Sequence, residues 1–520
     1  MNSAMVAIEE AVSEPKVIRS APASRVELHI CLLVVCAVPL LFSIPSLGDP
    51  FGQTEEAVNA AIWALGGRNI LEKGPVAARL GASVAPYPGT KDGIYAHHPP
   101  LPAWLAAAAQ LPGRWEGWPR LLALVLAGVS LLLLFHTLSR FAPEETALLA
   151  TAVIATSPFL LSYGRLLTTL TIATPLFLVL LDGALGRLTG GERWGGVFLA
   201  AIPLAFFSSW DGVLGAGAVV IFLTLLEVRD AYHHGSGRSE WCRALAPALV
   251  GVVSLAALLA YFGWANNDLG EMLTHARMRT GASDAVPPLE WITRQLGFVA
   301  SGLGWLTFLV LMGATILLAL RGGPRGLLAA ILLGAVPGVA MTIIFRNGAY
   351  SHPFWSYNLI IPAALAVAYA TTLVAGWHRR GASLLVGVLM VVQAVVGFRV
   401  AGDQLGRERL LNSVGALARD YFRQHPVETV KVMSAYDFHP YVSWYLRVPT
   451  EVVWSVRDLH ERLASARWAA SEPVLVDTDF ARDLGCRQFQ AAAISDNRRW
   501  AIAPGAAVDA ACSANLIHGG

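Results

Sequence analysis

The amino-acid sequence predicts a polytopic α-helical membrane protein with about eleven transmembrane helices, followed by a small extracytoplasmic α/β domain. Of its 520 residues, 55% are hydrophobic and only 14% are charged, whereas soluble domains are about 25% charged. The mean hydropathy is +0.54. The apolar residues also recur in blocks of about twenty, the length that crosses a bilayer core of roughly 30 Å.

The first apolar block covers about residues 29–46 and follows a polar tail, residues 1–28. Lys16, Arg19 and Arg25 precede the block and no small-residue cleavage signal ends it. We therefore expect an uncleaved signal anchor with a cytoplasmic N-terminus. Ten further blocks follow, at residues 119–138, 146–163, 166–186, 196–209, 213–227, 244–263, 298–320, 326–345, 354–376 and 383–399.

The short connections agree with this count. With the N-terminus inside, every connection expected on the cytoplasmic side carries arginine, as the positive-inside rule requires. These residues are Arg140, Arg187, Arg193, Arg229, Arg238, Arg243, Arg321, Arg325, Arg379 and Arg380. An odd number of spans places everything after residue 400 outside.

Three stretches are too long and polar to be simple connections. Within the membrane domain, residues 29–399, a first outer loop covers 48–118 and a second covers 264–297. The tail, residues 400–520, mixes helical patterns (410–424 and 456–466) with strand patterns (429–434 and 473–477), which predicts an α/β domain. Cys486 and Cys512 could form a disulfide if this tail is outside the cytoplasm.

Charge and cysteine content exclude some functions. The net charge is +2 and no lysine or arginine cluster has the density that a phosphate backbone requires, so we expect no nucleic-acid partner. The five cysteines have no metal-finger spacing.

The first outer loop begins with candidate catalytic acids. Thr54 is a plausible N-cap, which places Glu55 and Glu56 in the first turn of a helix, where backbone N–H groups favour the ionised carboxylate. Either acid could then act as a base. Acids in a first turn more often only complement the helix dipole.

The same loop ends in His97-His98-Pro99-Pro100. A residue before proline is extended, so the two histidines should point to opposite sides and only one should face a given cavity. Neutral histidine binds divalent metal ions, and protonated histidine pairs with phosphate. In isolation, a surface histidine in a rigid turn is the commoner interpretation.

Four further residues lie at the expected outer ends of spans. Arg165 and Arg346 could bind phosphate, Asp211 could contact the substrate, and His352 is, with His97, a candidate metal ligand. Singly, each has an ordinary structural interpretation: arginines at span ends reach the interface, and aspartates stabilise turns. Their convergence on the outer face is what suggests a site.

This order of features resembles the GT-C glycosyltransferases, specifically the branch of the protein O-mannosyltransferases and the aminoarabinose transferase of lipid A, often catalogued as family 39-like. The resemblance covers about residues 29–400, and its most specific element is His98-Pro99-Pro100-Leu101 with Trp104. The family's Asp-Glu pair falls on Thr54-Glu55 or Glu55-Glu56, with Asp49 in reserve. A further acid expected after Arg165 is replaced by Thr168 and Thr169.

The resemblance implies an inverting transferase at the outer face of the bacterial cytoplasmic membrane. It would move a sugar from a polyprenyl-phosphate carrier to a hydroxyl on a lipid, glycan or protein. Glu55 or Glu56 would deprotonate that hydroxyl, and His98, Arg165 and Arg346 would neutralise the departing phosphate. A divalent metal ion is a candidate cofactor, and no organic cofactor is expected.

A transporter or lipid-linked sugar flippase is the main alternative, and a non-catalytic assembly role is a second. A transporter predicts ionisable residues at span midpoints and two related halves of the chain. Here the halves do not match and the titratable groups gather at one face, which favours the enzyme.

Overall fold

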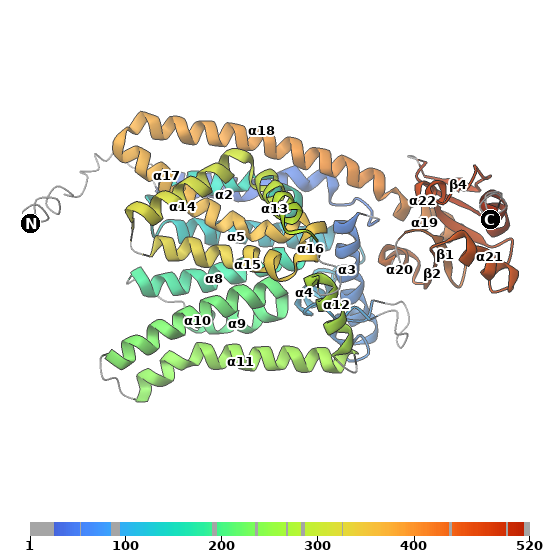
Figure 1. Ribbon diagram of the computed structural model, residues 1–520, viewed down its shortest axis with the longest axis horizontal. Coiled ribbons are helices and arrows are strands. Elements are labelled where there is room, and N and C mark those ends of the chain that lie inside the picture. The colour runs from blue at the N-terminus through green and yellow to red at the C-terminus, as the bar shows by residue number, and fades with distance from the viewer. Residues whose placement is uncertain are drawn as a thin grey trace, which may run out of the picture.

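Long apolar helices make up most of the chain, and a small sheet follows them (Figure 1). The structure is a computed structural model. It describes residues 25–52, 54–84, 94–189, 195–233, 238–266, 269–281, 286–324, 326–435, 439–495 and 498–513.

Eight helices among these residues are long and apolar enough to cross a membrane, two of them extended by a 3-10 turn. The chain is therefore a multi-pass membrane protein. The helices are α2 (Arg25–Ser43) with η1 (Ile44–Ser46), α5 (Gly117–Leu138), α8 (Thr169–Thr189), α10 (Trp210–His233), α11 (Arg238–Asn266), α15 (Leu327–Ile344), α17 (Ile360–Trp377) with η4 (Pro353–Leu359), and α18 (Arg379–Leu411).

The predicted count of eleven spans is not confirmed, because three of the eleven apolar blocks are not single long helices. One is bent by 108° between α13 (Pro288–Leu303) and α14 (Trp305–Arg321), where Gly304 has a φ of +81°. A second, α9 (Gly196–Ser208), has 13 residues. The third is divided into α6 (Glu144–Ala155) and α7 (Pro158–Tyr163), since a residue before proline leaves the helical region. Counting the bent pair as one span gives up to nine among the described residues.

Large apolar side chains cover the outside of the bundle. Leu249 on α11, Leu320 on α14 and Val391 on α18 are 65%, 80% and 65% exposed. Water would make such a surface unfavourable, whereas lipid chains would not. The exposed apolar surface therefore supports membrane insertion independently of helix length.

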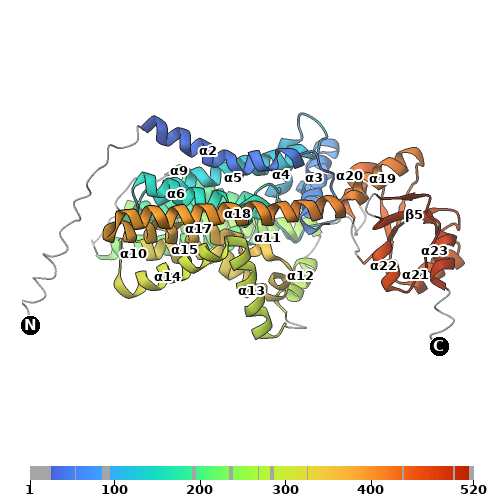
Figure 2. The same ribbon diagram turned by 90° about the horizontal axis from the view of Figure 1, so that it is seen from above.

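Four helices that are not candidate spans gather at one end of the bundle. These are α3 (Glu55–Lys73), α4 (Leu101–Ala109), α12 (Gly270–Thr280) and α16 (Arg346–Ser351), which lie on the side of the sheet. The last turns of α10, the first turns of α11 and the α17–α18 connection lie at the opposite end (Figure 1). Seen from above, α3, α4 and α12 again lie at the end of the bundle that faces the α/β tail (Figure 2). A single-turn η2 (Arg79–Gly81) completes the first loop.

The tail forms the α/β structure that the sequence predicts. Its five strands have the order β2-β1-β3-β5-β4, in which β2, β1 and β3 are parallel and β5 and β4 are antiparallel additions. The predicted strands and helices are found within a few residues of their expected ends. The elements are α19 (Ser413–Gln424), β1 (Val430–Met433), α20 (Pro440–Leu446), β2 (Thr450–Val453), α21 (Val456–Ala464), β3 (Pro473–Asp477), α22 (Thr478–Asp483), β4 (Ala493–Ile494), β5 (Trp500–Pro504) and α23 (Gly505–Ser513).

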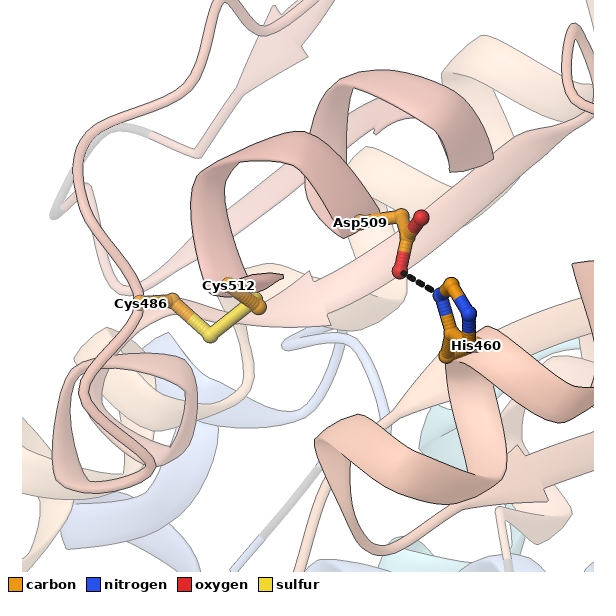
Figure 3. Close-up of a disulfide and its surroundings, with 4 residues drawn as sticks. All are labelled: His460, Cys486, Asp509 and Cys512. Carbon is orange, nitrogen blue, oxygen red and sulfur yellow. Dashed lines mark hydrogen bonds and ion pairs between the residues drawn. A yellow bond between two sulfur atoms is a disulfide. The ribbon is translucent and has the colours of Figure 1, made fainter. Parts of the chain in front are cut away.

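The tail contains one disulfide among its described residues. Cys486 and Cys512 are bonded, which links the loop after α22 to α23 (Figure 3). Nearby, His460 Nδ1 lies 3.4 Å from Asp509 Oδ1 and joins α21 to α23.

Helix α3 belongs to two hydrophobic cores at once. On one side Ala60, Ala61 and Ala64 pack with Val414 of α19 and Tyr441 of α20. On the other side, Ile62, Trp63 and Leu65 pack with residues of α4, α5 and α8. The helix that carries the predicted base therefore lies between the membrane helices and the α/β tail.

Candidate active site

The predicted base lies at the start of α3. Glu55 and Glu56 are its first two residues, and Thr54 caps it as predicted, with Oγ1 accepting a hydrogen bond from Ala57 N at 3.3 Å. The side chains of Glu55 and Glu56 lie outside the described residues. Position 59 is one helical turn after position 55, and the two positions share a face of α3. Asn59 lines a cavity described below.

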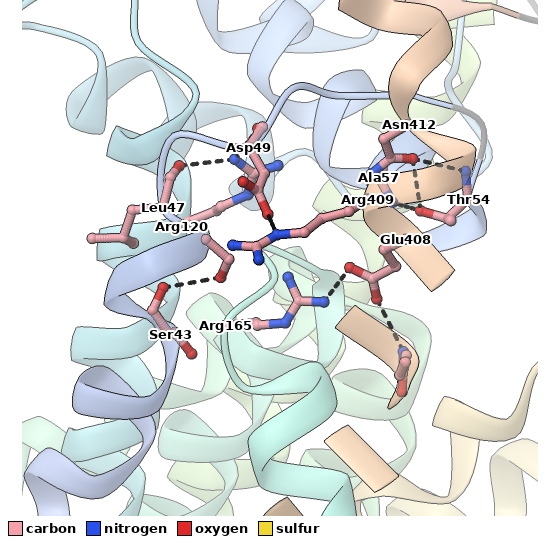
Figure 4. A network of polar contacts seen from close by, with 12 residues as sticks. Ser43, Leu47, Asp49, Thr54, Ala57, Arg120, Arg165, Glu408, Arg409 and Asn412 are labelled. Atoms are coloured by element: carbon pink, nitrogen blue, oxygen red, sulfur yellow. Dashed lines mark hydrogen bonds and ion pairs between the residues drawn. The ribbon is translucent and has the colours of Figure 1, made fainter. Parts of the chain in front are cut away.

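The end of α18 holds the segment that leads into α3 (Figure 4). Asn412 Oδ1 accepts hydrogen bonds from Thr54 N at 3.2 Å and from Thr54 Oγ1 at 3.3 Å. Arg409 Nε donates to Asp49 Oδ2 at 2.8 Å, and its Nη2 donates to the Pro45 carbonyl at 2.8 Å. Asp49, the reserve candidate for the base, is thus an ion-pair partner.

Arg165 is buried and forms an ion pair with Glu408 of α18, which is also buried (Figure 4). Gln404 donates a further hydrogen bond to the same carboxylate at 3.2 Å. The sequence suggested that Arg165 binds a donor phosphate. In the structure its guanidinium is instead paired with the carboxylate of Glu408. The Arg120 guanidinium also has protein partners. Its Nη1 donates to the Leu47 carbonyl at 2.8 Å and to the Asp49 carbonyl.

The two histidines of the first loop line different cavities, but they do not point to opposite sides as the sequence predicts, because their ring centroids are 4.8 Å apart. The His97 ring stacks on His275 with centroids 4.0 Å apart, and the His98 ring lies almost parallel to Tyr95 at 5.6 Å. His98 Nε2 is 3.3 Å from Arg279 Nη1. Within the described part of the chain, Nδ1 of each histidine is buried without a hydrogen-bond partner.

Burial is the main reason that the pKa of both histidines is held well below its usual value. The nearby charges lower it further, with His98 and His275 acting on His97, and Arg279 acting on His98. Both rings are therefore neutral at neutral pH. The permanent cation beside His98 is Arg279.

The histidines line two separate cavities that share Arg279. A cavity of about 160 Å³ is bounded by His97, His275 and Trp210 with apolar side chains of α12 and α15. A smaller one of about 40 Å³ is bounded by His98 and His352, by Asn59 and Trp63 of α3, and by Tyr95, Thr168, Thr169, Phe354 and Trp355. Thr168 and Thr169, which stand where the resemblance expects an acid, therefore give the smaller cavity hydroxyl groups.

From the sequence, Arg279 was only one of the outer-face arginines of the second loop, without an assigned role, and His275 was missed. Both lie on α12 in the second outer loop, and Arg279 also lies over the Trp355 ring, with its Cζ 5.6 Å from the ring centroid. The available signal was a polar helix rich in basic residues (Glu271 to Thr280) within an otherwise apolar domain. No short motif marks these two residues.

The structure brings some predicted residues to the cavities and leaves others apart. His97, His98 and His352 line them. Arg346 begins α16, next to the cavity residue Phe345, and its Nε and Nη2 are buried without a hydrogen-bond partner within the described residues. Asp211 lines neither cavity and accepts a hydrogen bond from Asn358 at 2.8 Å, while Asn358 in turn accepts one from Thr174.

A divalent metal ion does not fit the described side chains. No group of three or more histidine, cysteine, aspartate or glutamate residues among them could hold one. His97 and His352, the predicted ligands, line different cavities.

Comparison with solved structures identifies the fold. No protein-family model and no curated protein matches the sequence. ArnT from Cupriavidus metallidurans, crystallised with undecaprenyl phosphate, is similar with a TM-score of 0.61 and 14% identity over 94% of this chain and 98% of that one. The apo form of ArnT gives a TM-score of 0.58 and 13% identity, over 93% and 99%. At this identity the similarity shows the fold alone: the chain has the fold of ArnT, an aminoarabinose transferase of the kind that the sequence resembles.

Proposed function

We propose that this protein is a membrane glycosyltransferase that moves a sugar from a polyprenyl-phosphate carrier to a hydroxyl acceptor at the outer face of the bacterial cytoplasmic membrane. One observation carries the proposal. Within a GT-C fold, the cavity with Arg279, His98 and His352 is also lined by Asn59, one helical turn after Glu55. Asn59 shares a helix face with position 55, which supports a base near the cation Arg279, and the ArnT structure of this fold was solved with undecaprenyl phosphate.

The proposed chemistry is a direct displacement at the anomeric carbon. Glu55 or Glu56 takes the proton of the acceptor hydroxyl, whose oxygen forms the new bond from the face opposite the carrier. The bond between the anomeric carbon and the phosphate oxygen breaks, and its electron pair remains on the polyprenyl phosphate. Arg279, with His98 as a neutral hydrogen-bond donor and Arg346 nearby, stabilises that negative charge.

The proposed orientation places the N-terminus in the cytoplasm and the α/β tail outside. The arginines of the short connections support it through the positive-inside rule. The Cys486–Cys512 bond supports it too, because disulfides persist in oxidising compartments outside the cytoplasm.

The test incubates purified protein with radiolabelled polyprenyl-phosphate sugars and membrane extract. Wild type is compared with Glu55→Gln and Glu56→Gln, and with Glu144→Gln, a matched first-turn acid on α6. We expect transfer to fall by at least about a hundredfold in one of the first two variants and to persist in the third. Full transfer in both would contradict the assignment of the base.

A parallel arm tests the leaving-group site with Arg279→Gln. We expect a similar loss of transfer, since removing one donor that stabilises developing charge costs about a hundredfold or more. Addition of a chelator tests metal dependence separately. Movement of labelled solute into vesicles without cleavage of the sugar–phosphate bond would instead identify a transporter.

A further inference from the structure

A second cavity region lies between the membrane domain and the α/β tail, apart from the histidine-lined cavities. It is a cleft of about 260 Å³. Arg68 of α3, Arg114, Arg419 and Arg423 of α19 supply its basic side chains, and Glu116 is its acid. We call it the interdomain cleft.

Positive charge exceeds negative charge around the interdomain cleft. One carboxylate, Glu72, forms ion pairs with three guanidinium groups: Arg68 at 2.9 Å, Arg114 and Arg447. Arg419 pairs with the exposed Asp420 at 2.6 Å. Five arginines thus meet three carboxylates, Glu72, Glu116 and Asp420, which leaves two positive charges unmatched.

The positive charge of the nearby arginines also affects the pKa of a neighbouring lysine. Burial and then the charge of Arg447 lower the pKa of Lys73, which follows Glu72 at the end of α3. No ion pair involves Arg423 among the residues described. An anion placed in the interdomain cleft would relieve this repulsion.

Aromatic rings hold two of the guanidinium groups in position. Arg68 Cζ lies 5.5 Å from the centroid of the Trp444 ring, and Arg419 Cζ lies 5.8 Å from that of Tyr445. Both groups also have protein acceptors: Arg68 Nε donates to Glu72 at 2.9 Å, and Arg419 Nε and Nη2 donate to Asp420 at 2.6 and 3.2 Å. A phosphate or carboxylate in the cleft would therefore bind through the remaining N–H groups of these arginines and through Arg423.

The interdomain cleft is connected to the start of α3. The Tyr445 hydroxyl, which lines the cleft, accepts a hydrogen bond from Phe51 N at 2.9 Å. Phe51 stands three residues before the N-cap Thr54. A ligand in the cleft would therefore lie beside the segment that leads to the proposed base.

We propose that the interdomain cleft binds a phosphate or carboxylate group carried by the sugar acceptor, so that the enzyme prefers acidic acceptors. This specificity rests on the proposed glycosyltransferase function. Anion binding by the interdomain cleft does not depend on the transferase function, so it can be measured separately.

The binding arm uses detergent-purified full-length protein and inorganic phosphate as the probe, against chloride at equal ionic strength. We expect phosphate to raise the melting temperature of wild type, because a ligand that binds only the folded state stabilises it. The rise should be lost in Arg419→Gln/Arg423→Gln and kept in Arg457→Gln, an arginine on the exposed face of α21. An equal rise in all three proteins would overturn the proposal.

The transfer arm compares octyl glucoside with octyl glucoside 6-phosphate as acceptors. We expect wild type to show a KM about tenfold lower for the phosphorylated acceptor, the size of one charge-assisted contact. The double variant should lose that difference in KM between the two acceptors. Equal KM values in wild type would overturn the proposal while leaving the transferase intact.

Other outcomes separate the two hypotheses. If wild type transfers to neither acceptor nor to membrane extract, the transferase function fails and the binding arm alone decides on the cleft. If nanodiscs containing phosphatidylglycerol abolish the phosphate effect that is seen in phosphatidylcholine nanodiscs, a lipid headgroup fills the cleft and the acceptor assignment is wrong.

Discussion

His97 and His98 are adjacent in sequence, yet they line different cavities. Their rings nevertheless lie close together, with centroids 4.8 Å apart, and both contact Tyr95, so the expected placement on opposite sides of the chain is not found. Each ring is neutral because burial lowers its pKa. A neutral imidazole can still donate one hydrogen bond, and in the proposed mechanism the positive charge beside the phosphate is that of Arg279.

The lowered pKa values predict loss of stability in acid. Below the usual histidine pKa of 6.5, the unfolded chain takes up protons at both positions and the folded chain does not. The free energy of unfolding should therefore fall as the pH decreases below 6.5, by up to about 1.4 kcal/mol per pH unit for each histidine. The measurement is the melting temperature of detergent-purified protein between pH 7.5 and pH 5.

The histidine variants identify the source of this slope. His98→Gln should flatten the dependence on pH by the share of one histidine. His97→Gln should flatten it by a similar share, because burial lowers the pKa of that histidine too. A slope that is the same in wild type and His98→Gln would contradict the assignment.

Gly415 permits a close approach between the tail and the first loop. A Cβ atom at this position would lie 2.0 Å from the Phe51 carbonyl oxygen. Gly415→Ala should therefore push α19 away from the segment before α3 and destabilise the protein by about 1–3 kcal/mol, the usual cost of overpacking. Thermal unfolding measures this cost.

The matched control is Gly406→Ala on α18, where a Cβ atom would meet nothing within 4 Å. There alanine should stabilise the helix by up to about 1 kcal/mol. Equal melting temperatures for the two variants would show that the contact at Gly415 is not tight.

At the scale of elements, the helices were predictable and their pairing was not. The cap at Thr54 and the helix after it follow from residues adjacent in sequence, so both were predicted. The three blocks that failed as single spans contain a break that periodicity does not reveal, such as the bend at Gly304.

The contacts of α18 show why part of the site could not be predicted. Glu408 meets Arg165 across 243 residues, and Asn412 meets Thr54 across 358. A single sequence does not show that the end of α18 contacts the start of the first outer loop. Arg165 therefore looked like a phosphate ligand although a carboxylate was available to it.

The buried pair of Arg165 and Glu408 makes a second energetic prediction. Removing one partner leaves an uncompensated buried charge, which costs about 3–5 kcal/mol. Arg165→Met and Glu408→Met should each lower the melting temperature strongly. The double variant should recover most of the loss, because no charge is then left unpaired.

A double-mutant cycle from the four melting temperatures gives the coupling between the two side chains. Additive losses would show that the two residues act independently. In that case Arg165 would again be available as a ligand for the donor phosphate.

At the scale of the whole molecule, α18 joins the membrane domain to the tail without a loop. The helix runs from Arg379 to Leu411, and it passes through residue 400, where we predict the domain boundary. Because α3 packs on both domains and the end of α18 contacts the segment before it, the tail is fixed relative to the proposed base. The tail can therefore shape the acceptor side of the site.

This arrangement requires the two ends of the bundle to face different compartments, and a native cysteine can test it. Cys242 is exposed and free in the first turns of α11, next to the connection from α10, which lies opposite the end that carries α3 and the sheet (Figure 1). In a variant with Cys31→Ser and Cys36→Ser, Cys242 is the one remaining free thiol besides the disulfide pair. A membrane-impermeant maleimide should leave it unlabelled in intact cells and label it after permeabilisation.

The matched reporter is Ser465→Cys at the end of α21, in the same background. It should react in intact cells, because the proposed orientation places the tail outside the cytoplasm. Labelling of Cys242 in intact cells together with protection of the cysteine at position 465 would invert the topology. The candidate acids, Arg279 and the interdomain cleft would then face the cytoplasm, and a sugar donor presented at the outer face could not reach them.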